Sequence, residues 1–452
     1  MQTTTELKEY LMELMESRKF AKLRETADDV NPADLAAVLD TMEDEDSLKM
    51  FRLFPKDIAA DVFPLMEDDA QHYIIMSLST REASVVIDNL MSDDAADLLE
   101  EMPANVVTRL LSAASPETRQ DINQLLQYPD DSAGSVMTTE YVTLQEKMNV
   151  AQAIDRIRKV GLDSETINVC YVTDATRHLL GTVALRYLLI QPLDAIIGEI
   201  MNDNIISLKT LTDQEEAARL FQKYDFTAMP VVDKDNRIVG IITIDDVVDI
   251  IQEEATEDIE KMAAIIPTEK PYLRTGVFDT YKKRMPWLLF LMLSATFTGS
   301  IITSFEAALS SYVTLTAYIP MLMDTGGNSG SQASVSIIRG LSLNEIRLSN
   351  LPEVLWKEIR VAFICGCTLS ACNFVKLMLL DRLEMKIALV VCITLILVVL
   401  FAKTIGCILP ILAQSIGFDP AVMASPLITT IVDAISLLVY FTLATRILHI
   451  VV

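Results

Sequence analysis

Long runs of apolar residues, separated by short polar stretches, fill the C-terminal part of the chain. The first run, residues 287–305, holds 19 residues without a charge, close to the roughly 20 that an α-helix needs to cross a membrane. Four more runs follow, which predicts five membrane helices within a domain spanning 285–452. Splitting or merging runs at Pro320 or Pro410 would change that count. The other runs are residues 307–338, 361–380, 387–413 and 420–445.

Basic residues flank these runs unevenly. The triplet KKR at 282–284 precedes the first run and several Lys and Arg residues follow the second, whereas the loop near Glu306 has none. Short cytoplasmic loops carry the excess of Lys and Arg in membrane proteins. We therefore expect a multi-pass protein of the plasma membrane whose N-terminal part lies in the cytosol and whose C-terminus lies outside.

Short amphipathic units repeat in the first part of the chain. PADLAAVLDTM (32–42) and PKDIAADVFPLM (55–66) share a proline at the helix start, an acidic residue and an apolar stripe at helical spacing. STREASVVIDNLM (79–91) and SDDAADLLEEM (92–102) continue the series. Such units cannot bury their apolar faces singly, so they predict a stacked, all-α superhelical domain over residues 1–131.

A second repeat of a different kind follows. Residues 134–154 parallel 198–220, and 179–189 parallel 238–248, each copy with β-branched runs bounded by turn residues. The pattern predicts strand, helix, strand, turn, strand and helix in each copy, giving an α/β domain over 132–256. Residues 225–248 resemble the cystathionine-β-synthase (CBS) module, whose paired copies often sense adenine nucleotides or ions.

Charge is distributed very unevenly along the chain. The formal net charge is −26, and residues 1–275 hold 53 Asp and Glu against 25 Lys and Arg. A strongly acidic soluble part repels nucleic acid and attracts cations. A merely solvated acidic surface is the alternative interpretation of this part taken alone.

One helix concentrates this charge on a single face. Over residues 244–263, five acidic side chains fall within an arc of about 80° at helical spacing. We interpret this face as an array of oxygen ligands neutralised by divalent cations of the Mg²⁺ or Ca²⁺ type. A solvated face is the alternative, and we expect a linking helix to continue over 257–284. The five residues are Asp246, Asp249, Glu253, Glu257 and Glu260.

Two membrane motifs carry a resemblance that covers nearly the whole chain. PMLMDTGGNSGSQAS (320–334) and DPAVMASPLITTIVD (419–433), behind a helical superhelix, paired CBS modules and an acidic helix, resemble the bacterial MgtE magnesium channel family. The resemblance implies a homodimer in the lipid bilayer, with a pore for divalent cations between the two membrane domains. It implies Mg²⁺ as both the transported and the regulatory ion.

Asp433 is the main candidate for contact with a permeating ion. A carboxylate in mid-membrane costs roughly 2.5–3.5 kcal/mol, so it should face water, a partner or an ion. Mg²⁺ usually keeps several waters and binds one or two carboxylates. A protonated or hydrogen-bonded aspartate is the alternative. The full set of candidate pore residues is Asp433, Asn328, Gly326, Gly327, Gln332, Asp419 and Ser425.

The glycine-rich segment TGGNSGSQ favours a break in the second membrane helix, where backbone carbonyls would approach the pore. Close packing of helices against the same glycines is the alternative. We also expect Ser425 and Pro426 to kink the last helix beside Asp433.

The resemblance further implies negative feedback, in which cytosolic Mg²⁺ bridges acidic groups and closes the pore. Phe226 and Tyr171 are candidates for stacking on an adenine ring, which would make ATP a second ligand. The candidate regulatory ligands are Asp213, Glu215, Asp225, Asp246, Asp249, Glu254, Glu257 and Asp258, with Asp93, Asp94 and Asp97 opposite them.

Other functions fit the sequence less well. An ATP-driven pump is disfavoured because no GxxxxGK[ST] motif occurs, and an enzyme is disfavoured because His72, His178 and His449 are scattered. A channel for Co²⁺, Mn²⁺ or Ca²⁺ remains an alternative, as does a membrane-anchored sensor that conducts nothing.

Overall fold

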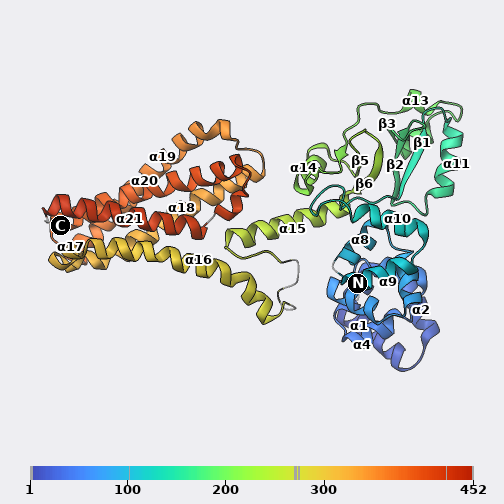
Figure 1. Ribbon diagram of the computed structural model, residues 1–452, viewed down its shortest axis with the longest axis horizontal. Helices are drawn as coiled ribbons and strands as arrows, with labels where there is room; N and C mark the ends of the chain where they lie inside the picture. The colour runs from blue at the N-terminus through green and yellow to red at the C-terminus, as the bar shows by residue number, and fades with distance from the viewer. Residues whose placement is uncertain (1–3, 101, 269–271, 273–274, 424, 450–452) are drawn as a thin grey trace. The chain divides into compact units, whose positions relative to one another are not determined.

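The computed structural model describes residues 4–100, 102–268, 272, 275–423 and 425–449, and it divides into two compact units (Figure 1). The first unit is Met1–Ile251 and the second is Gln252–Val452. Each unit is described by itself below.

The first unit begins with short amphipathic helices that share one hydrophobic core. Local signals fix their starts, because the Asn31 side chain caps the helix that opens at Pro32, and Ser79 and Glu82 form a reciprocal capping box. This confirms the predicted all-α repeat domain. The helices are α1(Thr4–Glu16), α2(Phe20–Asp29), α3(Pro32–Asp40), α4(Asp44–Phe51), α5(Lys56–Val62), α6(Asp68–Ser77), α7(Thr80–Ile87), α8(Ser92–Glu100), α9(Ala104–Ala113) and α10(Pro116–Leu125).

The remainder of this unit is two copies of a three-stranded α/β module. In each copy the first strand pairs parallel with the second and the second pairs antiparallel with the third, as the sequence repeat predicts. The first copy is β1(Tyr141–Gln145), α11(Val150–Val160), β2(Thr166–Thr173), β3(Leu179–Ala184) and α12(Leu185–Ile190). The second is α13(Ile197–Ile200), β4(Leu208–Lys209), α14(Gln214–Tyr224), β5(Ala228–Val232), β6(Ile238–Thr243) and α15(Ile244–Met262).

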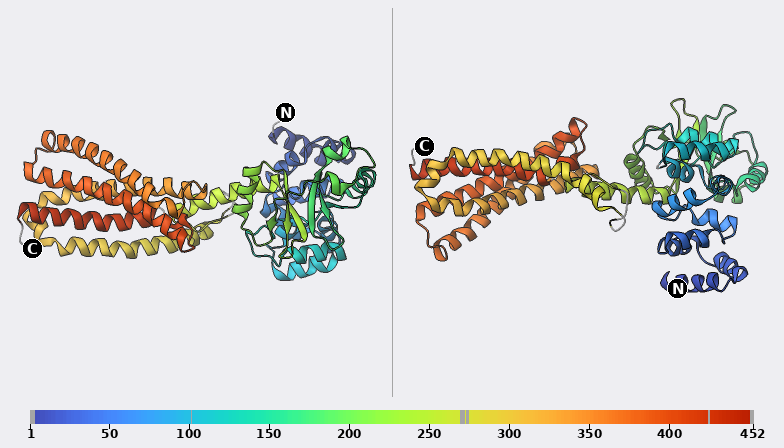
Figure 2. Two further views of the ribbon diagram at one scale, coloured as in Figure 1. Left: turned by 90° about the horizontal axis from the view of Figure 1, so that it is seen from above. Right: turned by 60° about the horizontal axis from the view of Figure 1, so that its bottom comes forward.

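The two modules share a small core and direct backbone hydrogen bonds. The Thr138 amide donates to the Ile241 carbonyl at 2.8 Å, and the Ile241 amide donates back at 2.9 Å. The side chains of Tyr171 and Leu179 from one module pack with Ile238 of the other. The pair is therefore one structural body, and the helices of both modules cover its strands (Figure 2).

The second unit begins within α15. This helix ends at Met262, and the chain enters a left-handed conformation at Ala264, where φ is 56°. The next helix begins only at Val277. The expected linking helix over 257–284 is therefore two helix ends joined by a connection.

Five long helices run side by side in this unit (Figures 1 and 2). The predicted second span is not one continuous helix. It consists of a short helix, a 3-10 turn and then the long helix α18. The helices are α16(Val277–Ser304), α17(Glu306–Ser311), η1(Val313–Tyr318), α18(Ile319–Ser342), η2(Leu348–Asn350), α19(Leu351–Leu379), α20(Met385–Ser415), η3(Pro420–Met423) and α21(Ser425–Leu448).

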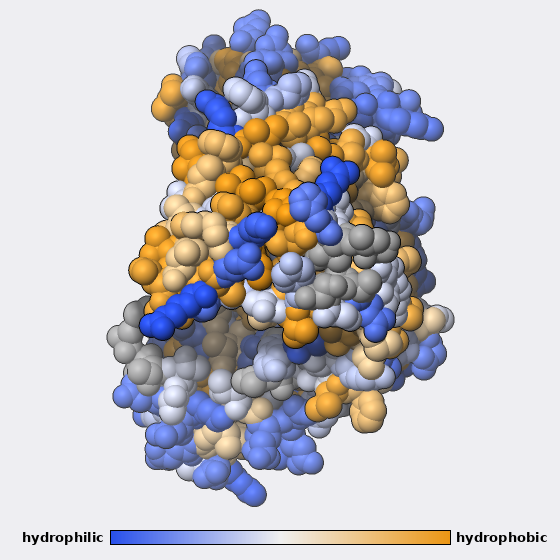
Figure 3. Space-filling model, turned by 90° about the vertical axis from the view of Figure 1, so that its left-hand side faces the viewer, coloured by the Kyte–Doolittle hydropathy of each residue, from blue (hydrophilic) through white to orange (hydrophobic). Residues whose placement is uncertain are grey.

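Among the described residues, four of these helical segments are long and apolar enough to cross a membrane, and they contain α16, α19, α20 and α21. Helix α18 is also long, at 24 residues, but the polar segment around Asn328 makes it less apolar. Hydrophobic side chains gather on the surface of the membrane helices (Figure 3). This surface suits a lipid environment.

Candidate permeation path and acidic cluster

Asp433 lies well inside α21, which begins at Ser425 and ends at Leu448, and seven residues separate it from Ser425. Its side chain is half buried, and its Oδ1 atom is enclosed without a hydrogen-bond partner among the described residues. The carboxylate of Asp324 on α18 is close enough to repel it electrostatically. An enclosed acceptor beside a second acid is a costly arrangement that a cation would relieve.

Polar side chains of α18 form an exposed line beside this carboxylate. Asp324, Asn328 and Gln332 are four residues apart, so they lie within an arc of about 80° on one face. All three are exposed in the protomer, and we call them the polar stripe. The polar stripe is therefore an exposed face of α18, whereas many other residues of this helix are buried.

The glycines of α18 do not line this surface. Helix α18 is continuous through the glycine-rich segment, so its backbone carbonyls remain in the helix, and the expected break is wrong. Gly326 and Gly327 are buried, and an added Cβ would come within 2.7 Å of Val398 and 2.9 Å of Thr429, respectively. Both glycines allow α18 to pack closely against its neighbours, and their assignment as pore residues stays a prediction.

Asp419 lies before α21 rather than inside a membrane helix. Its Oδ1 accepts a hydrogen bond from the Ala421 amide at 2.8 Å, which orders the turn η3. Its Oδ2 lies 2.7 Å from Nζ of Lys261 at the end of α15, and Glu257 lies 2.5 Å from the same Nζ. Although partial burial acts in the opposite direction, these carboxylates raise the pKa of Lys261. Ser425 opens α21, but its side chain lies outside the described part of the structure.

The same unit also contains a buried ion pair that was not apparent from the sequence. Lys403 on α20 is only 6% exposed, and its Nζ lies 3.9 Å from Oε2 of Glu358 on α19. The apolar run around Lys403 contained the signal, because a charge there needs a partner. The sequence could not show which helix supplies that partner.

The first unit gathers carboxylates where α8 meets the CBS pair and the start of α15. Their charges act on one another across these elements, and we call the group the acidic cluster. The structure thus brings Asp93 and Asp94 close to Asp246, while adding acids that sequence reasoning missed. The acidic cluster consists of Asp93, Asp94, Glu140, Glu165, Asp245 and Asp246.

Burial and mutual repulsion shift the titration of this cluster. Burial, with Asp246 adding to it, raises the pKa of Asp94 to about 6 and that of Glu165 to about 7. Burial also raises the pKa of Asp93 well above its ordinary value, and Asp94 and Asp246 add to the effect. The cluster therefore resists carrying its full negative charge at neutral pH.

Glu140 also holds two elements together. Its Oε2 accepts hydrogen bonds from Ser92 Oγ at 2.7 Å and from Thr138 Oγ1 at 2.7 Å. Ser92 is the first residue of α8, so this contact joins the helical domain to the CBS pair. Nothing in the local sequence marks Glu140 or Glu165 for this position.

Of the other predicted regulatory acids, Asp249 acts electrostatically on Asp246 of the acidic cluster. Asp213 caps α14, Glu215 forms an ion pair with Arg219, and Asp225 ends α14 in a left-handed conformation with φ of 53°. Asp97 and Asp249 are exposed. Glu254, Glu257 and Asp258 belong to the part of α15 in the second unit.

The described residues hold no group of three or more His, Cys, Asp or Glu side chains that could hold a metal ion by themselves. A divalent ion at the acidic cluster would therefore bind through one or two carboxylates and its own waters, a mode that Mg²⁺ tolerates.

The two candidate aromatic residues for a nucleotide are not equivalent. Tyr171 is fully buried in the core between the modules, so its stacking on an adenine ring stays a prediction that would require this core to open. Phe226 is only partly buried and stacks on Tyr224, with ring centroids 5.7 Å apart. The burial of Tyr171 depends on the second module, which local sequence cannot reveal.

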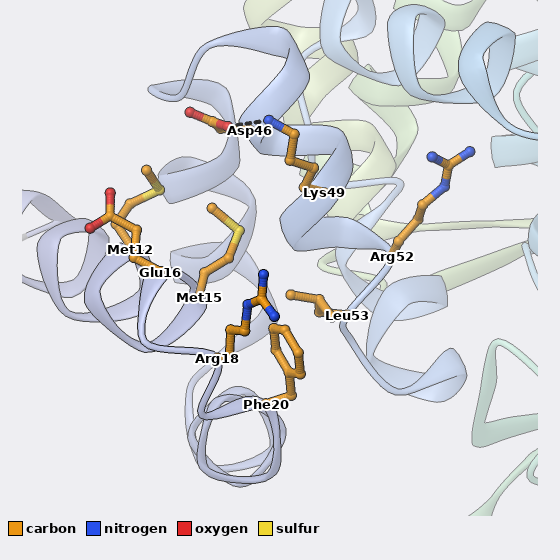
Figure 4. A pocket seen from close by; sticks show the side chains of 9 residues that line it. All are labelled: Met12, Met15, Glu16, Arg18, Phe20, Asp46, Lys49, Arg52 and Leu53. Carbon is orange, nitrogen blue, oxygen red and sulfur yellow. Dashed lines mark hydrogen bonds and ion pairs between the residues drawn. The ribbon is translucent and has the colours of Figure 1, made fainter.

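A cavity of about 520 Å³ opens between α1, α2 and α4 (Figure 4). Met12, Met15 and Phe20 give it an apolar lining. At its edge Lys49 pairs with Asp46 at 2.9 Å, and Arg52 lies 3.6 Å from Glu82. None of the predicted site residues lines it.

Comparisons with known proteins agree with this architecture. A divalent cation transporter family model, MgtE, matches residues 319–443, the MgtE intracellular N domain matches 30–131, and the CBS domain matches 133–192 and 197–253. The magnesium transporter MgtE of Thermus thermophilus is 36% identical over 443 residues, which cover 97% of this chain and 98% of the relative. That of Bacillus subtilis is 31% identical, covering 96% of each.

Two solved structures are similar to the first unit. The soluble part of a magnesium transporter has 29% identity and a TM-score of 0.53, covering 56% of this chain and 99% of that one. The cytosolic domain of the Mg²⁺ channel MgtE in complex with ATP has 36% identity and a TM-score of 0.51, covering 53% and 98%.

The apolar helices, the CBS pair and these matches define a membrane transporter of divalent cations with a large soluble part. The chain belongs to the MgtE family of magnesium transporters.

Proposed function

We propose that the chain forms a homodimeric, Mg²⁺-selective channel that conducts passive influx and is closed by cytosolic Mg²⁺. The observation that carries the permeation part is the enclosed, unpartnered carboxylate oxygen of Asp433 in the middle of α21. A hydrated Mg²⁺ ion would satisfy this oxygen without losing its whole water shell.

The polar stripe supports a pore between two protomers. Asp324, Asn328 and Gln332 are exposed in a helix of the membrane domain, where contact with lipid would be costly. Helix α16 has no buried residue along its length, so it also leaves surface for a second copy. A symmetric dimer would enclose both polar stripes around a water-filled path.

The membrane potential supplies the driving force in the orientation that the basic loops favour. An inside-negative potential is worth roughly 2.3 kcal/mol per charge per 100 mV, hence about 4.6 kcal/mol for a divalent ion. Influx in this direction needs no further energy source.

The acidic cluster supports closure by cytosolic Mg²⁺. At low Mg²⁺ its carboxylates repel one another across α8, the CBS pair and the start of α15. Divalent ions would cancel that repulsion, stabilise the compact arrangement and, through α15, hold the pore closed. Several weak bridges acting together would have to supply roughly 5.5 kcal/mol to convert a 1:99 equilibrium into 99:1.

The CBS pair is also proposed to take an adenine nucleotide, because a related cytosolic domain was solved in complex with ATP. Phe226 is the aromatic residue accessible to such a ligand, since Tyr171 is enclosed. Equilibrium dialysis with labelled ATP should show uptake that Phe226→Ala reduces, and no uptake by the native chain would contradict it.

Flux through the full-length protein in liposomes tests the channel. Asp433→Asn should abolish most Mg²⁺ flux, whereas Asp279→Asn, at an exposed acid of α16, should leave it unchanged. Native flux in Asp433→Asn would contradict the proposed pore. Removing residues 1–260 should make flux insensitive to internal Mg²⁺, and competition with Co²⁺, Mn²⁺ and Ca²⁺ ranks the ions.

A further inference from the structure

The first residue of the polar stripe of α18 is a carboxylate. Asp324 is exposed and lies on the same face as Asn328 and Gln332. No Lys or Arg of the described chain forms an ion pair with it or with Asp433, and the one buried lysine, Lys403, pairs with Glu358 instead. Among the described residues, none compensates the negative charge of this face.

Packing fixes the position of Asp324 relative to Asp433. Gly326 of α18 contacts Val432 and Ser436 of α21, and Gly330 contacts Ile428, so the two helices are antiparallel. Val432 and Ser436 flank Asp433, which places Asp433 near the level of Gly326. Asp324 lies two residues from Gly326 towards Ile319, about 3 Å along the helix axis.

The two carboxylates belong to different helices and yet influence each other electrostatically. Like charges held this close in a membrane domain destabilise it unless a cation lies near both. Asp433 has an enclosed oxygen, whereas Asp324 is exposed, so an ion could contact Asp324 first and Asp433 second. Conduction requires such successive sites, each weak enough to release the ion.

We propose that Asp324 is a second ion-contacting carboxylate of the permeation path, which captures the hydrated divalent cation on the outer side and passes it to Asp433. The proposal rests on the proposed channel function and orientation. In a homodimer the path would hold two copies of each carboxylate, an arrangement that favours divalent over monovalent cations because attraction scales with ion charge.

Voltage-clamped flux through the full-length protein tests the role of Asp324. Asp324→Asn keeps the size of the side chain but removes its charge, so the external Mg²⁺ concentration for half-maximal flux should rise about tenfold. Maximal flux at saturating Mg²⁺ should persist, the Mg²⁺ to Na⁺ permeability ratio should fall, and Asp324→Glu should restore both values. Glu306→Gln removes an exposed charge from α17 and should change neither.

Each other outcome is informative. Unchanged half-saturation and permeability ratio in Asp324→Asn would overturn the inference. So would a loss of maximal flux at native half-saturation that Asp324→Glu fails to restore, because that pattern indicates a packing role. A native protein that carries no divalent current would overturn the proposed channel itself, and this inference with it.

Discussion

At the scale of single residues, the membrane unit contains two kinds of buried charged group, one with an ionic partner and one without. Lys403 is nearly inaccessible and has Glu358 as an ionic partner, whereas the enclosed oxygen of Asp433 has no partner within the described chain. A paired charge stabilises a fixed contact between two helices. An unpaired carboxylate remains available to bind a permeating cation.

The pair of Lys403 and Glu358 should therefore matter for stability. Lys403→Met leaves a buried, uncompensated carboxylate, and such losses cost about 3–5 kcal/mol. The melting temperature of the purified protein should fall clearly. Lys403→Met combined with Glu358→Leu should recover most of the loss, because no charge remains unpaired.

Lys376 provides the matched control. It lies 3.0 Å from Asp381, but both side chains are substantially exposed, so Lys376→Met should cost less than about 1 kcal/mol. Equal losses in Lys376→Met and Lys403→Met would show that burial of the Lys403 pair has no energetic consequence.

At the scale of elements, the end of α15 is fastened to the turn that precedes α21. Lys261 lies between Glu257 of its own helix and Asp419 of that turn, and Met262 packs against Ile338 and Ala421. This contact connects a helix rich in acidic residues with the helix that carries Asp433. The ammonium group of Lys261 reduces the repulsion between these two carboxylates, as a bound cation would.

Removal of this ammonium group should weaken closure. In Lys261→Met, two carboxylates lose their shared partner, so the internal Mg²⁺ concentration that halves the flux should rise about fivefold, as expected for an ion pair worth about 1 kcal/mol. Lys282→Met removes an exposed lysine 3.8 Å from Asp279 and serves as the control. An unchanged Mg²⁺ response in Lys261→Met would exclude Lys261 from gating.

At the scale of the whole molecule, negative charge is concentrated in the part that is proposed to sense Mg²⁺. The net charge of −26 arises almost entirely in residues 1–275. In the acidic cluster, burial and repulsion raise the pKa values of Asp94 and Glu165 towards neutrality. Protons and divalent cations should therefore compete for the same oxygens.

This competition predicts a pH dependence. Between about pH 4 and 7 the folded cluster binds more protons than the unfolded chain, so stability without divalent ions should be highest at the acidic end and fall as pH rises through about 7. Added Mg²⁺ should restore stability at pH 8 more than at pH 6. Thermal melting of residues 1–251 at pH 5 to 8, with and without Mg²⁺, measures both effects.

The double variant Asp94→Asn and Glu165→Gln separates the cluster from the general acidity of the chain. It should flatten the pH dependence and reduce the response to Mg²⁺. A native melting temperature that rises from pH 5 to 8 without Mg²⁺ would contradict the repulsion on which the cluster argument rests.

Sequence predicted what local pattern determines. Periodicity predicted the helical repeats and both CBS modules, and a charge within an apolar run placed Asp433 inside the last helix, as the structure has it. It failed where the outcome depends on distant partners. Glycines that break a helix and glycines that allow a neighbouring helix to pack closely cannot be distinguished in the sequence. For Gly326 and Gly327, the neighbouring side chains of Val398 and Thr429 show the close packing. Glu165 joins the acidic cluster through tertiary contacts alone.

The tight seating of α18 has a consequence for how the channel opens. Gly406 of α20 approaches the Gly330 carbonyl so closely that a Cβ at position 406 would clash with it, while Gly326 and Gly327 lie against α21. Because α18 packs so closely on these sides, it cannot rotate its polar stripe without displacing α20 and α21. If the chain forms the proposed homodimer, its pore should instead widen by movement of the three helices as one rigid body away from the second copy.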